Sequence, residues 1–200
     1  MRRISAIFAT ALAAAHPAIA EDSNGQFAIK GAGLQTCESL VKSWDGQSSD
    51  LGLYAGWVDG YLTGMNQHSK TTFDIAPWQS TTTLLSLLRQ MCTQRDANDR
   101  VIDLLNDLMS DFAPARLKEQ SSASAIRRGD SALVLYDETV SALQRRLTQE
   151  GFDPGEPNGV YTDQTATALE AFQTSRGLTV TGLPDQKTLF ALFVQTTVKN

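Results

Sequence analysis

The chain has 200 residues, of which 42% are hydrophobic, and a formal net charge of −5 at pH 7. An acidic chain without a cluster of basic residues is poorly suited to nucleic acid or to an anionic membrane surface, so neither is expected as a partner. Two histidines are also too few for a catalytic zinc site, which usually has about three protein ligands with histidine among them.

The first 20 residues have the pattern of a signal peptide. Arg2 and Arg3 precede an apolar run over 4–15, and the tripeptide AIA over 18–20 offers small residues for cleavage. The run is shorter than the roughly 18 apolar residues of a membrane anchor, and no later stretch is long and apolar enough to span a bilayer. We therefore expect cleavage after residue 20 and a soluble periplasmic chain with 15 basic and 22 acidic residues, a net charge of −7.

The two cysteines, Cys37 and Cys92, both lie in the exported part. An even pair in an oxidising compartment predicts one disulfide, with two free buried thiols as the alternative. Their spacing excludes a CxxC redox motif.

The range 27–112 is predicted to be an all-helical domain. Apolar residues recur at helical spacing in four segments, and Thr36 is a candidate cap for the first of them. The third is expected to begin near Pro77, because proline is tolerated at the first position of a helix. We expect helices over 36–44, 51–68, 77–92 and 101–108, with the disulfide joining the first to the third.

Three glycines, Gly56, Gly60 and Gly64, recur every fourth residue in the second expected helix. Each glycine inside a helix costs roughly 1 kcal/mol relative to alanine, so close packing in the core is the expected compensation. The alternative is a groove for a partner protein.

Residues 113–130 are polar and rich in serine and alanine, without a sustained apolar face. This composition predicts a linker, partly helical, between two domains. A polar leader over 21–26 precedes the first domain.

The range 131–200 reads as three short helices that end at glycines. The first begins near Asp137 and ends at Gly151, and Thr162 is a candidate cap for the second. Pro184 is expected at the first position of the third helix. The predicted fold class is therefore all-α, with a disulfide-linked four-helix domain followed by a three-helix domain.

The C-terminal range also carries an ordered set of short motifs. Between 140 and 193 these are LQ-x-x-L, GF, NG-x-Y-x-x-x-T, AFQ, GL and G-x-x-x-x-x-T. Together they resemble the three-helix peptidoglycan-binding domain found in many cell-wall hydrolases, and the resemblance implies peptidoglycan as the partner.

Candidate contacts with the wall follow from the chemistry of its peptides and N-acetyl groups. Asn158, in the turn with Gly159, and Gln173 could read amides, Tyr161 could present a flat face, and Arg176 could pair with a carboxylate. Two alternatives stay open, namely that Tyr161 belongs to the core and that Gln173 satisfies loop backbone groups. Gln144, at the equivalent place in the first helix, is expected to have that structural role.

A second set of motifs lies in the N-terminal domain. The segments TCESL, WVDGYLTG and LLRQMCTQRDANDRV fall within 34–109 and resemble the small helical periplasmic domain of the HdeA type. Members of that family have one disulfide, and some act as chaperones in acid.

No catalytic set stands out. His68 is the one histidine of the mature chain, the thiols are expected to be bridged, and a G-x-S-x-G motif is missing. Glu38, Asp45 and Asp59 resemble solvated surface carboxylates. We expect a non-catalytic periplasmic peptidoglycan-binding protein without metal or cofactor, which anchors the helical domain to the wall. The alternatives are an HdeA-like acid-stress chaperone localised by the wall module, and an adaptor that recruits an envelope protein.

Overall fold

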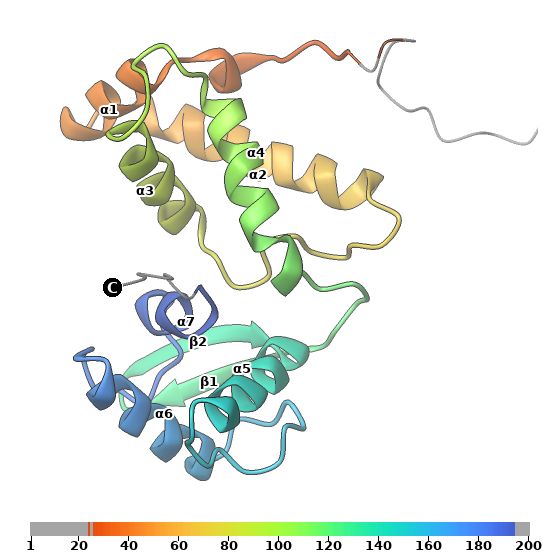
Figure 1. Cartoon of the computed structure of the whole chain (residues 1–200), viewed down its shortest axis with the longest axis vertical. Coiled ribbons are helices and arrows are strands. Elements are labelled where there is room, and N and C mark those ends of the chain that lie inside the picture. Colours follow the sequence, from red (N-terminus) through yellow and green to blue (C-terminus); the bar gives the residue numbers. More distant parts are fainter. Residues whose placement is uncertain (1–23, 25, 195–200) are drawn as a thin grey trace, which may run out of the picture.

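The computed structural model describes residue 24 and residues 26–194, and the expected signal peptide lies outside these residues. The chain folds into two lobes, one made of α1–α4 and the other of a β-hairpin with α5–α7 (Figure 1). The fold is mostly helical, as predicted, with one small two-stranded sheet.

The four predicted N-terminal helices are confirmed. The lobe contains η1 (Gly31–Leu34), α1 (Cys37–Asp45), α2 (Leu51–His68), α3 (Thr81–Cys92), α4 (Val101–Phe112) and η2 (Ala113–Ala115). The helices enclose one apolar core in which several side chains have no exposed surface: Leu40, Val58, Leu88, Val101 and Leu105.

Side-chain caps set where the first and third helices begin. The Thr36 hydroxyl accepts a hydrogen bond from the Ser39 amide at 3.3 Å, so Thr36 caps α1 as expected. The third helix begins later than predicted, because the Ser80 hydroxyl caps it by accepting from the Thr83 amide at 3.2 Å. Pro77 lies in the preceding loop.

The predicted disulfide is present. It joins Cys37, the first residue of α1, to Cys92, the last residue of α3. Both cysteines are buried, with 1% and 6% of their surface exposed. The cross-link therefore lies inside the core of the N-terminal lobe.

The predicted core position of the glycine stripe on α2 is wrong. A Cβ atom added at Gly56, Gly60 or Gly64 would have no neighbour within 4 Å, so this face is open. The core side of α2 instead carries Tyr54 and Val58. Positions two residues apart on a helix are separated by about 200°, which places the glycines on the opposite face.

The second half of the predicted linker is a strand. Residues Ala123–Arg128 form β1, which pairs antiparallel with β2 (Ser131–Tyr136) from Ala123↔Tyr136 to Arg128↔Ser131. Gly129, with φ +54°, lies in the turn between them. The strand forms because its backbone pairs with β2 and Ile126 is buried in the core of the second lobe.

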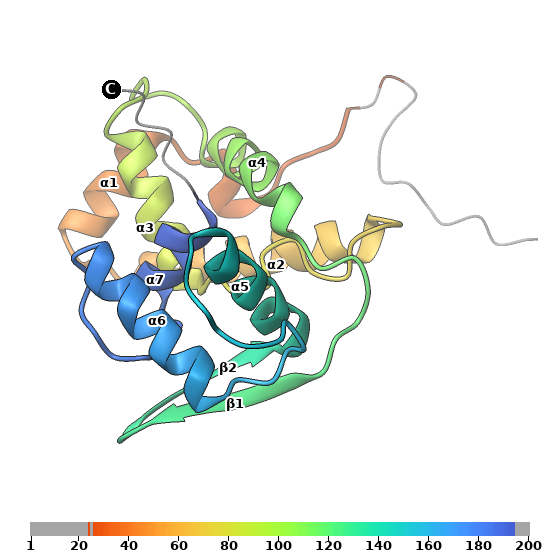
Figure 2. The same cartoon turned by 60° about the horizontal axis from the view of Figure 1, so that its bottom comes forward.

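The C-terminal lobe has the three expected helices, α5 (Asp137–Gln149), α6 (Asp163–Ser175) and α7 (Gln186–Phe193). The Thr162 hydroxyl caps α6 as predicted, accepting from the Thr165 amide at 3.2 Å. The cap of α7 is Asp185, whose carboxylate accepts from the Thr188 amide at 2.9 Å. Pro184 therefore precedes the cap and is not the first helical residue. Figure 2 shows the hairpin running alongside α5 and α6.

The loop between α2 and α3 packs against both lobes. Trp78 is 5% exposed, packs into the C-terminal core and lies 5.9 Å from Phe193 and 6.1 Å from Phe112 between ring centroids. The Gln186 side chain accepts from the Ser80 amide at 3.0 Å and donates to the Trp78 carbonyl. These contacts place α7 beside α3 (Figures 1 and 2).

Candidate functional site

The loop between α5 and α6 is organised by one buried amide. The Gln144 side chain, 1% exposed, accepts from the Gly159 amide at 3.1 Å and donates to the Val160 carbonyl at 3.0 Å and the Thr165 hydroxyl at 3.1 Å. Gln144 thus holds the loop that carries Asn158, which agrees with its predicted structural role.

Gly159 occupies a position that only glycine fits without strain. Its φ is +80°, and a Cβ atom there would lie 2.6 Å from the Asp137 carbonyl oxygen. We predict that Gly159→Ala lowers the free energy of unfolding by about 1–3 kcal/mol, through the left-handed backbone and the overlap. The matched control is Gly151→Ala, which has φ +89° but open space, and thermal unfolding of both variants is the measurement. Equal losses in the two variants would show that the overlap does not contribute.

Asn158 and Tyr161 lie on the same loop but differ in exposure. Asn158 is exposed, and its side-chain oxygen accepts from the Val160 amide at 2.9 Å. Tyr161 is half-buried against the core and donates its hydroxyl to the Gly182 carbonyl at 2.7 Å. This burial raises the pKa of the Tyr161 phenol. Asn158 is thus available to a ligand, whereas Tyr161 mainly ties the loop to the one after α6.

Gln173, one of the residues predicted to contact the wall, lies inside the C-terminal lobe. Its side chain is fully buried, accepts from the Thr181 and Gly182 amides at 2.9 and 3.0 Å, and donates to the Leu183 carbonyl at 3.0 Å. Gln173 therefore holds the loop after α6 as Gln144 holds the loop after α5. Its burial favours the alternative left open by the sequence, in which Gln173 satisfies backbone groups of the loop.

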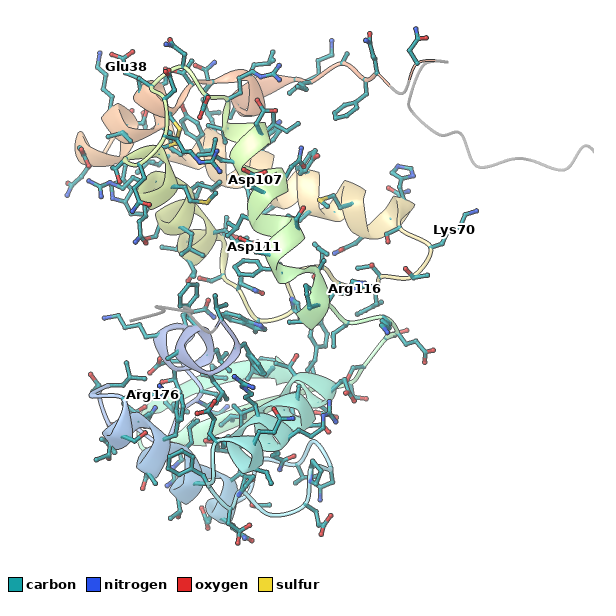
Figure 3. All side chains as sticks on the ribbon, in the orientation of Figure 1. Glu38, Lys70, Asp107, Asp111, Arg116 and Arg176 are labelled. Carbon is teal, nitrogen blue, oxygen red and sulfur yellow. A yellow bond between two sulfur atoms is a disulfide. The ribbon has the colours of Figure 1, made fainter. Side chains whose placement is uncertain are left out.

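Arg176 directly follows the last residue of α6, and its side chain is 47% exposed. Its guanidinium lies 5.4 Å from the centre of the Phe172 ring and donates to the Glu150 carboxylate at 2.7 Å. Figure 3 shows Arg176 at the left side of the C-terminal lobe, in the half nearer to the N-terminal lobe. It lines a groove between the lobes that includes neither Asn158 nor Tyr161. The predicted contacts thus divide between the turn at Asn158 and the groove at Arg176.

Sequence reasoning missed Arg128, at the end of β1. Its guanidinium donates to Asp163 at 3.0 Å and Glu170 at 3.1 Å, both on α6. These bonds attach the hairpin to α6 and raise the pKa of Arg128, mainly through the bond to Glu170. The signal was Gly129-Asp130, a two-residue turn of the kind that joins hairpin strands.

We searched the described residues for side chains that could together bind a metal ion. Within residues 24 and 26–194, no three His, Cys, Asp or Glu side chains gather as a set that could hold a metal ion. His68 is exposed at the end of α2. In the same part of the chain, every helix is too short or too polar to cross a bilayer.

Comparison with known proteins gave one match. Residues 136–192, which begin at the last residue of β2 and include most of α7, match the family model described as "Putative peptidoglycan binding domain". No curated protein and no solved structure matched the chain. The HdeA-type resemblance of the N-terminal lobe thus received no support and stays a prediction. The match over residues 136–192 supports the resemblance of the C-terminal lobe to a peptidoglycan-binding domain.

Proposed function

We propose that the protein is a non-catalytic periplasmic protein that binds peptidoglycan through its C-terminal lobe and holds the N-terminal lobe at the wall. The family match over residues 136–192 carries the proposal, because the matched family is a binding domain. The buried disulfide supports an oxidising compartment outside the cytoplasm.

The proposed contacts are Asn158, on the turn after α5, and Arg176, at the groove between the lobes, which are the exposed side chains of the predicted set. Gly159 shapes the turn beside Asn158, and Tyr161 and Gln173 hold the neighbouring loops from inside the lobe. An exposed amide and a half-exposed guanidinium suit the amides and carboxylates of murein peptides.

The direct test is co-sedimentation of the protein, without residues 1–20, with purified sacculi. We expect the protein to pellet with sacculi and Asn158→Ala and Arg176→Ala each to weaken binding about threefold, the loss of one polar contact. The matched controls are Asn98→Ala and Arg95→Ala, which remove an exposed asparagine and an exposed arginine side chain from the N-terminal lobe. Arg95 is a close match because it also pairs with one carboxylate, that of Asp107, at 2.9 Å.

Two results would overturn the proposal. Pelleting no higher than that of an unrelated soluble protein would remove the binding function. Release of soluble fragments from sacculi by the purified protein would contradict the non-catalytic role.

A chaperone of the HdeA type is the second candidate. The N-terminal lobe exposes Phe27 by 49%, Leu34 by 49% and Leu53 by 69%, which are apolar groups that an unfolded client could contact. Light scattering of an aggregating client at low pH, with and without the full protein, tests this candidate. Unchanged aggregation would count against it.

A further inference from the structure

An open groove separates α3 of the N-terminal lobe from α7 of the C-terminal lobe. Its volume is about 830 Å³. One wall is formed by α3 and the other by α7 and the end of α6, so neither lobe forms the groove alone.

The α3 wall presents a row of hydrogen-bonding groups. Thr82, Ser86 and Gln90 are spaced by four residues, which aligns them along one face of the helix, and all three are exposed. The groove also has apolar lining residues, which are Leu87 on the α3 wall and the partly buried Leu178 and Phe190 on the other wall. This arrangement suits an extended chain with small apolar side chains and backbone amides.

The charge of the groove indicates the sign of its ligand. Among the described residues that line it, the charged side chains are Arg176 and Lys187, and both are cationic. Arg176 shares the Glu150 carboxylate with Arg146, at 2.7 and 3.3 Å, so one carboxylate serves two guanidinium groups. Two cations concentrated in one groove of a chain with net charge −5 favour a ligand that carries carboxylates.

We propose that this groove binds the peptide part of peptidoglycan, with Lys187 and Arg176 pairing with peptide carboxylates and α3 donating and accepting hydrogen bonds along the peptide backbone. The inference rests on the proposed function and deepens it. Murein peptides are short, have small apolar side chains and carry free carboxylates. The side chains match the apolar lining residues, the backbone amides match the hydrogen-bonding groups of α3, and the carboxylates match Arg176 and Lys187. The N-terminal lobe is then part of the binding site, in addition to being held at the wall by the C-terminal lobe.

Two variants test the groove from opposite walls. Lys187→Glu reverses the charge of an exposed side chain on α7, and Ser86→Trp fills the groove from an exposed position on α3. The matched controls are Lys70→Glu, on the loop after α2 and far from Arg176 in Figure 3, and Ser110→Trp, at an exposed position of α4. Circular dichroism checks that all four fold.

The probe is a soluble murein stem peptide titrated into the full protein by calorimetry. We expect Lys187→Glu and amidation of the peptide carboxylates each to raise the Kd about tenfold, because each removes one charge of a complementary pair. Ser86→Trp should raise the Kd by a similar factor, because the indole occupies the space of the ligand. The two control variants should bind within about twofold of the wild-type protein, since they lie outside the groove.

Each outcome bears on one proposal or the other. Sacculus pelleting without stem-peptide binding, or with equal peptide affinity in all variants, overturns the groove assignment and leaves the proposed function intact. Competition for the groove by an uncharged N-acetylglucosamine oligosaccharide would also overturn the assignment. Peptide binding without pelleting would instead contradict the proposed function.

Discussion

Replacing both Cys37 and Cys92 with alanine is expected to lower the free energy of unfolding of the N-terminal lobe by about 4 kcal/mol. The disulfide joins residues separated by 55 positions, so it restricts the unfolded chain strongly, and the estimate follows from the entropy of closing a loop of that length. The loss is large because small domains typically have only about 5–15 kcal/mol of stability.

Urea unfolding followed by tryptophan fluorescence measures this effect. Trp44 and Trp57 pack against the N-terminal core, so a version that keeps only one of these two tryptophans reports the unfolding of the N-terminal lobe. The matched control replaces the exposed neighbours Glu38 and Thr93 with alanine. An unchanged midpoint for the cysteine variant would show that the cross-link does not stabilise the lobe.

Gln173→Leu is expected to destabilise the C-terminal lobe by about 3–5 kcal/mol. Leucine has a similar size but leaves the Thr181 and Gly182 amides and the Leu183 carbonyl without their partner. Each buried polar group that loses its hydrogen bond costs about 1–3 kcal/mol. The loop after α6 should loosen first, because Gln173 is its main attachment to the helix.

Thermal unfolding and amide hydrogen exchange at Thr181 and Gly182 are the measurements. Gln149→Leu is the control. Gln149 is exposed on α5, and its side-chain oxygen accepts a hydrogen bond from Arg146 at 3.2 Å. If both variants unfold at the same temperature, the buried amide network does not carry the stability assigned to it. A loss of protection across the C-terminal lobe that is largest in the loop would agree with the prediction.

The helices and their caps could be predicted because the interactions that define them are local. Thr36 and Thr162 each cap a helix through an amide three residues later, and Gly151 ends α5 in a left-handed conformation. The disulfide could be predicted because the chain has only two cysteines. The motifs that resemble the peptidoglycan-binding domain were also recognisable, because each corresponds to a local turn, cap or buried position and they occur in a fixed order.

The hairpin was missed because its pattern is weak. Within β1 only Ile126 is buried, so the strand shows little alternation of apolar and polar residues and resembles a polar linker. Its stability comes from pairing with β2 and from bonds between Arg128 and α6, which are contacts between distant parts of the chain.

By itself, the sequence determined the helices and most of their ends, because caps and turns depend on short-range hydrogen bonds. It determined the disulfide because the chain has only two cysteines, and its ordered C-terminal motifs were sufficient for the family match. Tertiary packing decided that the glycine face of α2 is open and that Gln173 is buried. It also brought α3 and α7 together to form the groove. These features depend on how elements distant in sequence pack, and local patterns do not specify which face of a helix is covered.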